Sequence, residues 1–209
     1  MLYRISWVIA WPFLRIFFSA KGREHIPAAG PFVVVANHVY DIDPYHIGPF
    51  LSFGTVIHWL AKRELYHPTE IYDEYLNKML DVFSFLPTGL VRLMNWPFVG
   101  WISFLIRNSS VIPVDRERNN SRTNRLAVKR AMHLLRAGKV VGVFGEGGIG
   151  RDGEAHPVFV ALARKAGCPI LPVKVVKGGV VFGETIDLKG DERDTQTVAK
   201  EIMERIYAL

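Results

Sequence analysis

The fold is decided by residues 32–43, which read FVVVANHVYDID. The first four residues form a continuous apolar run rich in β-branched side chains, which is typical of a strand buried on both faces of a sheet. Asn37 and His38 follow in a polar loop, and the acids and proline after them are typical of a helix start. Ligands of open α/β sheets gather beyond the carboxyl ends of the strands, so this loop is a candidate functional site.

Strands and helices alternate along the rest of the chain. Apolar runs predict further strands at 56–60, 110–114, 140–144 and 170–176. Helices are predicted at 41–51, 98–106, 121–137, 156–166 and 195–208, with an apolar helical insertion of one or two helices at 68–95. This order predicts an α/β layered domain over residues 22–209, with a mostly parallel central sheet flanked by helices.

Composition limits the classes of protein that fit. The chain has 209 residues, of which 49% are hydrophobic, so it can bury an ordinary core. Its single cysteine, Cys168, excludes an internal disulfide and a cysteine-based zinc site. The net charge is +6, and the basic surplus between residues 107 and 136 accounts for all of it. No nucleic-acid-binding signature accompanies these cations, so we expect a lipid head group, a phosphate-bearing substrate or an acidic carrier protein as partner, and no nucleic acid.

The N-terminal segment is apolar and aromatic. Residues 2–18 read LYRISWVIAWPFLRIFF, and a helix of that length reaches only about 25 Å, less than the roughly 30 Å hydrocarbon core of a bilayer. Arg4 and Arg15 fall on nearly the same side of such a helix. We therefore predict that residues 1–21 form an amphipathic helix that contacts a membrane peripherally or monotopically on the cytoplasmic side. The alternative is a helix that packs on the domain.

His38 is the candidate general base. A histidine has an unperturbed pKa near 6.5, and a carboxylate on its second ring nitrogen fixes the tautomer. Spacing leaves Asp41 and Asp43 both eligible for that role. The alternative is a structural histidine with no part in catalysis.

Other motifs are weaker. Residues 145–150, GEGGIG, match a dinucleotide-binding fingerprint formally, but no helix opens on the last glycine, so we predict a turn that lets a substrate approach the backbone near Glu146. Lys62 and Arg116 each follow a predicted strand and suit a phosphate if they converge. The sequence has no nucleophile elbow, P-loop or zinc motif, so we expect no metal and no resident cofactor.

In this order the motifs resemble those of the glycerolipid acyltransferases, typified by 1-acylglycerol-3-phosphate (lysophosphatidic acid) acyltransferases. The likeness runs from about residue 22 to residue 175. It comprises N-H-x-x-x-x-D at 37–43, K-x-E-L at 62–65, V-D-R at 114–116, five of the eight residues of E-G-T-R-S-R-D-G at 146–153, and a proline- and valine-rich strand at 169–173.

The resemblance implies an acyltransferase that moves a fatty acyl group from acyl-CoA or acyl-carrier protein to the hydroxyl of 1-acylglycerol-3-phosphate. His38 would be the general base and Asp43 its orienting partner. We expect oxyanion-stabilising amides near Gly147 and Gly148. The full set expected to bind substrate is Asn37, Lys62, Arg116, Glu146, Gly147, Gly148 and Arg151, with Lys62 and Arg116 on the phosphate and Arg151 replacing a missing cation.

The chain departs from the family where Gly148 and Ile149 stand in place of Thr and Arg. This leaves the acceptor open among lysophosphatidic acid, glycerol-3-phosphate, another lysophospholipid and a glycolipid. Two other hypotheses are a non-catalytic lipid-binding protein of the same fold and a hydrolase that uses His38 to activate water.

Overall fold

The computed structural model describes residues 15–41, 43–52, 54–108, 111–115, 122–147 and 155–209. Its strands are β1 (Ser19–Lys21), β2 (Phe32–Ala36), β3 (Ile57–Lys62), β4 (Ile112–Val114), β5 (Val140–Phe144), β6 (Ile170–Val176) and β7 (Gly179–Phe182). They form one sheet in the order β1-β7-β6-β2-β5-β3-β4. Only the β6–β7 pair is antiparallel among these strands, so the predicted mostly parallel α/β sheet is confirmed.

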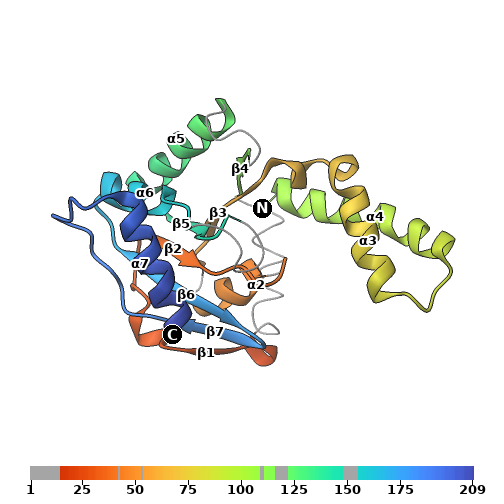
Figure 1. The fold of residues 1–209 in the computed structure, drawn as a ribbon, viewed down its shortest axis with the longest axis horizontal. Coiled ribbons are helices and arrows are strands. Elements are labelled where there is room, and N and C mark those ends of the chain that lie inside the picture. Colours follow the sequence, from red (N-terminus) through yellow and green to blue (C-terminus); the bar gives the residue numbers. More distant parts are fainter. Residues whose placement is uncertain (1–14, 42, 53, 109–110, 116–121, 148–154) are drawn as a thin grey trace.

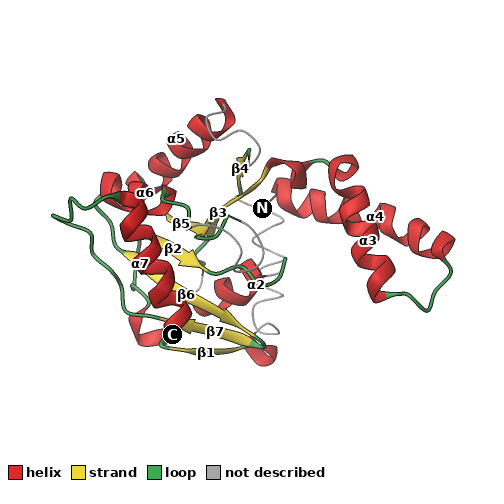
Figure 2. Cartoon of the chain, in the orientation of Figure 1, coloured by secondary structure: helices red, strands yellow, loops and turns green. Residues whose placement is uncertain are grey.

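Helices lie around this sheet (Figures 1 and 2). The α-helices are α2 (Asp43–Ile47), α3 (Pro68–Val82), α4 (Thr88–Asn108), α5 (Arg122–Arg136), α6 (Val158–Ala166) and α7 (Thr195–Ala208). Short 3-10 helices are η1 (Arg23–His25), η2 (Gly48–Phe50) and η3 (Arg63–Tyr66). Residues 1–14, which include most of the predicted N-terminal helix, lie outside the described residues.

Strand β2 divides the interior into two cores. All five of its residues are buried, and successive side chains of a strand point to opposite faces. Val33 and Val35 pack in the core that α5, α6 and α7 cover, whereas Phe32, Val34 and Ala36 pack in the core under α2 and η2. This arrangement explains why the run is continuously apolar instead of alternating.

Strands β1 and β7 were not predicted from the sequence. Ser19–Lys21 is only three residues long and pairs in parallel with β7 at the edge of the sheet. Gly179–Phe182 is four residues long and returns antiparallel along β6 after a short turn. Short strands carry too few residues for a periodic signal. Ser19–Lys21 also falls within residues 1–21, so the end of that segment is part of the sheet.

Helix α4 is longer than predicted. The insertion expected to end at residue 95 runs on through the separate helix expected at 98–106, and Pro97 lies inside one continuous helix. A proline removes one intrahelical hydrogen bond and usually kinks or ends a helix. Here Val91 and Val99 are buried on either side of it, and this packing holds both halves in one helix.

Helices α3 and α4 form a hairpin that stands out from the sheet (Figure 1). Ile71, Tyr75 and Val99 make a small core of its own between the two helices. The base of the hairpin is joined to β3 through η3, so whatever contacts the hairpin is mechanically linked to the C-terminal end of that strand.

Candidate active site

The carboxyl ends of β2 and β5 bring two sequence motifs together. The backbone N–H of Gly145 donates to the carbonyl of Ala36 over 2.9 Å, which extends the pairing of the two strands by one residue. Beyond this bond, the Glu146 carboxylate accepts from the backbone N–H of His38 over 3.3 Å. The site therefore forms at the predicted sheet edge.

His38 and Asp43 form a hydrogen-bonded pair. Nδ1 of His38 lies 2.9 Å from Oδ2 of Asp43. The same carboxylate oxygen accepts from the backbone N–H groups of Val39 and Tyr40, over 2.7 and 2.9 Å. Asp43 is fully buried, whereas the His38 side chain keeps 11% of its surface exposed. The loop thus holds the carboxylate in place with three donors while the imidazole still reaches solvent. Of the two acids that spacing left eligible, Asp43 is the one in contact.

Aromatic rings fix the plane of the imidazole. The His38 ring stacks on Phe144 at a centroid distance of 4.0 Å, and Phe144 stacks on Trp59 at 4.6 Å, both nearly parallel. The stack has room because Gly142 lies beneath Trp59, where a Cβ atom would come within 2.5 Å of the indole. Sequence reasoning missed this support, since nothing in the spacing of the three residues indicates stacking.

His46 is a second histidine at the pair. Its Nδ1 lies 3.4 Å from Oδ1 of Asp43, so the buried carboxylate has an imidazole on each side. Burial lowers the pKa of His46 and outweighs the opposing effect of the Asp43 charge, which favours the neutral ring at neutral pH. The ring also contacts Phe18 at 4.2 Å. In the sequence, His46 could have been found from its position three residues after Asp43, which places the two side chains about one helical turn apart on α2.

Asn37 has a structural partner. Its amide donates to the carbonyl of Val175 over 3.1 Å and accepts from the N–H of the same residue over 2.6 Å. The side chain is therefore occupied in tying the end of β2 to β6, at a buried position. It positions the loop that carries His38.

Lys62 also has a partner. Its ammonium group pairs with Glu74 of α3, whose second oxygen accepts from Lys78 over 3.0 Å. Lys78 in turn lies 2.7 Å from the carboxylate of Asp41. Burial raises the pKa of Glu74, but the hydrogen bonds and charges of the two lysines overcome this and lower it. Lys62, the expected phosphate-binding cation, is therefore part of a network of ion pairs, which could not be seen in the sequence.

Gly147 forms the turn after β5. It adopts a left-handed conformation, with φ of 69°, and its N–H donates to the carbonyl of Phe144 over 3.2 Å. This hydrogen bond closes the turn. Arg116, Gly148 and Arg151 lie outside the described residues.

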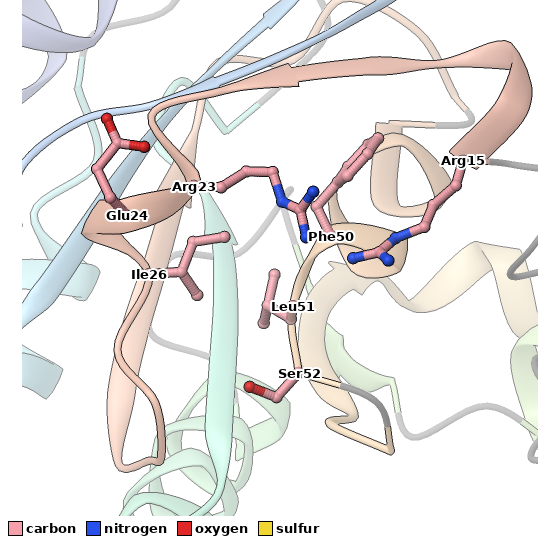
Figure 3. A pocket seen from close by; sticks show the side chains of 7 residues that line it. All are labelled: Arg15, Arg23, Glu24, Ile26, Phe50, Leu51 and Ser52. Carbon is pink, nitrogen blue, oxygen red and sulfur yellow. The ribbon is translucent and has the colours of Figure 1, made fainter.

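A cavity of about 570 Å³ lies away from His38 and Asp43. It is lined by Arg15, Arg23, Glu24, Ile26, Phe50, Leu51 and Ser52. The side chains of Arg15 and Arg23 approach it from either side of Phe50 (Figure 3). Arg23 follows β1 and Ile26 precedes β2, so this cavity lies toward the amino end of β2, whereas His38 lies at the carboxyl end. Within the described ranges no cluster of His, Cys, Asp and Glu has the arrangement of a metal site.

The fold and the candidate site resemble those expected for a glycerolipid acyltransferase domain, and comparisons with known proteins show what the chain is similar to. The family model described as Acyltransferase matches residues 88–176, a region that includes Glu146 and begins after His38. The chain is 25% identical over 176 residues to "1-acyl-sn-glycerol-3-phosphate acyltransferase BAT2, chloroplastic" of Brassica napus. This alignment covers 82% of the chain and 40% of that relative, so the chain spans less than half of the relative's length.

Among solved structures, the chain resembles the 1-acyl-sn-glycerophosphate (LPA) acyltransferase PlsC from Thermotoga maritima. The TM-score is 0.57 at 22% identity, over 98% of this chain and 75% of the other. This likeness shows a shared fold. With the family match and the curated relative, it confirms the resemblance inferred from the motifs.

Proposed function

We propose that this protein is an O-acyltransferase. It transfers a fatty acyl group from a thioester donor, acyl-CoA or acyl-carrier protein, to the free hydroxyl of 1-acylglycerol-3-phosphate and yields phosphatidic acid. The observation that carries the proposal is the contact of 2.9 Å between His38 Nδ1 and the buried Asp43 carboxylate, at the carboxyl end of a central strand. The acyltransferase relatives support the class of reaction.

The geometry suits general-base catalysis. An ionised carboxylate only accepts hydrogen bonds, so Nδ1 of His38 carries the proton and Nε2 presents a lone pair. In the proposed reaction, Nε2 takes the proton of the acceptor hydroxyl as its oxygen attacks the thioester carbonyl. The tetrahedral intermediate then collapses, the C–S bond breaks, and the imidazolium returns the proton to the thiolate. Asp43 stabilises the imidazolium between the two steps, and no acyl-enzyme is formed.

The acceptor phosphate needs cations. We propose Lys62, Arg116 and Arg151 for this role, with the guanidinium groups suited to bidentate binding of phosphate oxygens. Lys62 pairs with Glu74, so a phosphate that binds Lys62 must share it with that carboxylate or displace it. Lys78 is a further cation at the same network, 2.7 Å from Asp41 in the loop of His38.

A second candidate is the same chemistry on another acceptor. Gly148 and Ile149 replace the Thr and Arg usual in the resembling family, which removes one cation from the E-G motif. This departure favours a test of glycerol-3-phosphate, other lysophospholipids and glycolipids beside lysophosphatidic acid.

The substrate also implies a location. A monoacyl acceptor resides in a membrane leaflet, so we propose that the protein acts as a peripheral or monotopic membrane protein on the cytoplasmic side, with residues 1–21 as one contact. In the part of the chain that the structure describes, no helix is both long and apolar enough to cross a bilayer.

A panel experiment tests the proposal. The purified protein is incubated with labelled acyl-CoA or acyl-carrier protein and with each candidate acceptor in turn, and the products are identified by mass. The proposal expects phosphatidic acid from lysophosphatidic acid as the main product. Transfer to another acceptor but not to lysophosphatidic acid would show that the protein uses the other acceptor. Release of free fatty acid without any acceptor would indicate a hydrolase.

A further inference from the structure

Helix α4 presents a large apolar face to solvent. Its buried face holds Val91 and Val99 together with two polar residues, Asn95 and Ser103, which are 0% and 1% exposed. On the opposite face, large apolar side chains are exposed, among them Leu93 at 72% and Trp101 at 58%. A helix that packs on a protein in water normally carries polar and charged residues on its outer face. The exposed face of α4 is therefore built for a partner that is not water.

The exposed residues share one stripe. At about 100° per residue, five of them fall within an arc of about 100°. They are Leu90, Leu93, Met94, Trp101 and Phe104. Trp96 and Phe98 flank this stripe, and Val82 and Phe85 are exposed at the tip of the hairpin. Of the fifteen exposed large hydrophobic side chains in the described residues, nine belong to this hairpin, so the patch is concentrated.

The charges of α4 indicate what the partner is. No Asp or Glu occurs between Thr88 and Asn108, and the cations Arg92 and Arg107 lie toward the two ends of the helix. Exposed tryptophan, aliphatic residues and arginine without acids are the composition that favours the interfacial layer of a membrane with anionic lipids. A protein partner would not require the acids to be missing.

We infer that the outward face of α4 and the tip of the α3–α4 hairpin form a membrane-docking surface, which inserts its aromatic and aliphatic side chains among the head groups of an anionic bilayer. This surface is distinct from the predicted N-terminal helix. The hairpin stands out from the sheet, so its outer face can reach a flat surface (Figure 1).

The docking surface is connected to the candidate active site. Lys78 of α3 contacts Asp41 in the loop of His38, and Glu74 of α3 contacts Lys62 at the end of β3. A hairpin seated on the membrane therefore holds the His38 loop close to the leaflet that contains a lipid acceptor. This last step rests on the proposed function, whereas the docking itself does not.

Binding to vesicles tests the inference. The full-length chain is sedimented with vesicles of phosphatidylcholine alone or mixed equally with phosphatidylglycerol, without lysolipid or acyl donor. Leu93→Ser and Trp101→Ser should each weaken binding to the mixed vesicles roughly tenfold, because each removes one apolar side chain from the interface. Leu209→Ser is the matched control, since Leu209 is exposed at the end of the chain beyond α7, and it should bind like the wild type. His38→Ala should also bind normally, which separates docking from catalysis.

A local probe separates this surface from the N-terminal segment. Cys168 is buried, and burial raises the pKa of its thiol to about 11, so an introduced cysteine is labelled selectively near neutral pH. An environment-sensitive dye on Leu93→Cys should shift to the blue when vesicles are added, and the same dye on Leu209→Cys should not. Unchanged emission at position 93, or unchanged vesicle binding of both serine variants, would overturn the inference. The inference would also be overturned if the wild type sedimented as a dimer without lipid and the serine variants sedimented as monomers, because the apolar face would then bind a second copy of the chain.

Discussion

Nδ1 of His38 and Oδ2 of Asp43 lie 2.9 Å apart, and the carboxylate of this pair has no exposed surface. Burial of a carboxylate is costly unless hydrogen bonds compensate for the lost water. Here the imidazole and the N–H groups of Val39 and Tyr40 supply them on one oxygen. The loop is therefore built around Asp43, and in the proposed mechanism this carboxylate fixes the tautomer and orientation of His38.

Asp43→Asn should lower kcat by two to four orders of magnitude. The amide group can donate to Nδ1, which moves the ring proton to Nε2 and removes the lone pair that accepts the substrate proton. Asp41→Asn is the matched control, because Asp41 faces Lys78 and not His38. Steady-state kinetics at saturating acceptor give the comparison, and an equal loss in both variants would contradict the assignment of Asp43.

Gly142→Ala should disturb the ring stack beneath His38. The added methyl group would meet the Trp59 indole at 2.5 Å and Cγ2 of Ile57 at 2.7 Å, so overpacking should cost about 1–3 kcal/mol of unfolding free energy. A displaced Trp59 shifts Phe144, and kcat should fall with stability. Gly100→Ala has open space around the new Cβ and should be neutral or stabilising. Urea unfolding and kcat measure both effects, and a fully active, equally stable Gly142→Ala would show that the stack is adaptable.

Lys62 and Glu74 should affect the acceptor KM in opposite directions. Lys62→Gln removes the proposed phosphate cation and should raise KM with little change in kcat. Glu74→Gln removes the competing carboxylate, releases Lys62 and Lys78, and should lower KM. The comparison uses acceptors with and without a phosphate, since only the former should respond. A raised KM in both variants would mean that the network is needed intact and that Lys62 does not bind phosphate alone.

His46 should make stability fall as the pH drops below about 6.5. Burial lowers the pKa of His46 in the folded protein, so the unfolded chain takes up a proton at a pH where the folded chain does not. Its contribution is present above the unfolded pKa and is lost as the pH falls toward the folded pKa. His46→Gln should flatten the pH dependence of the unfolding free energy below 6.5 without abolishing it; a slope equal to that of the wild type would contradict this account.

Regular patterns in the sequence predicted most of the sheet. The β-branched run at 32–35 and the matching runs at 140–144 and 170–176 are confirmed as strands, because burial on both faces requires such runs. The structure pairs the first of them with both of the others. Gly167 ends α6 in the left-handed conformation, with φ of 61°, which favours glycine. Edge strands β1 and β7 were missed, since three or four residues carry no usable period.

The site was predicted in its residues but not in its contacts. The motif at 37–43 indicated His38 with an acid, and the structure brings Asp43 and Glu146 to it. The partners of Asn37 and Lys62 could not be predicted, because they lie 138 and 12 residues away and depend on packing between separate elements. The same holds for the stack of His38 on Phe144.

The most direct test of the central claim is thioester release by His38→Ala with and without lysophosphatidic acid, at wild-type levels of folded protein. Release of the thiol should depend on the acceptor in the wild type, and the variant should be slower by a factor of about 10² to 10⁴ while it still unfolds in one cooperative transition. Acceptor-dependent release at the wild-type rate in His38→Ala would contradict the account.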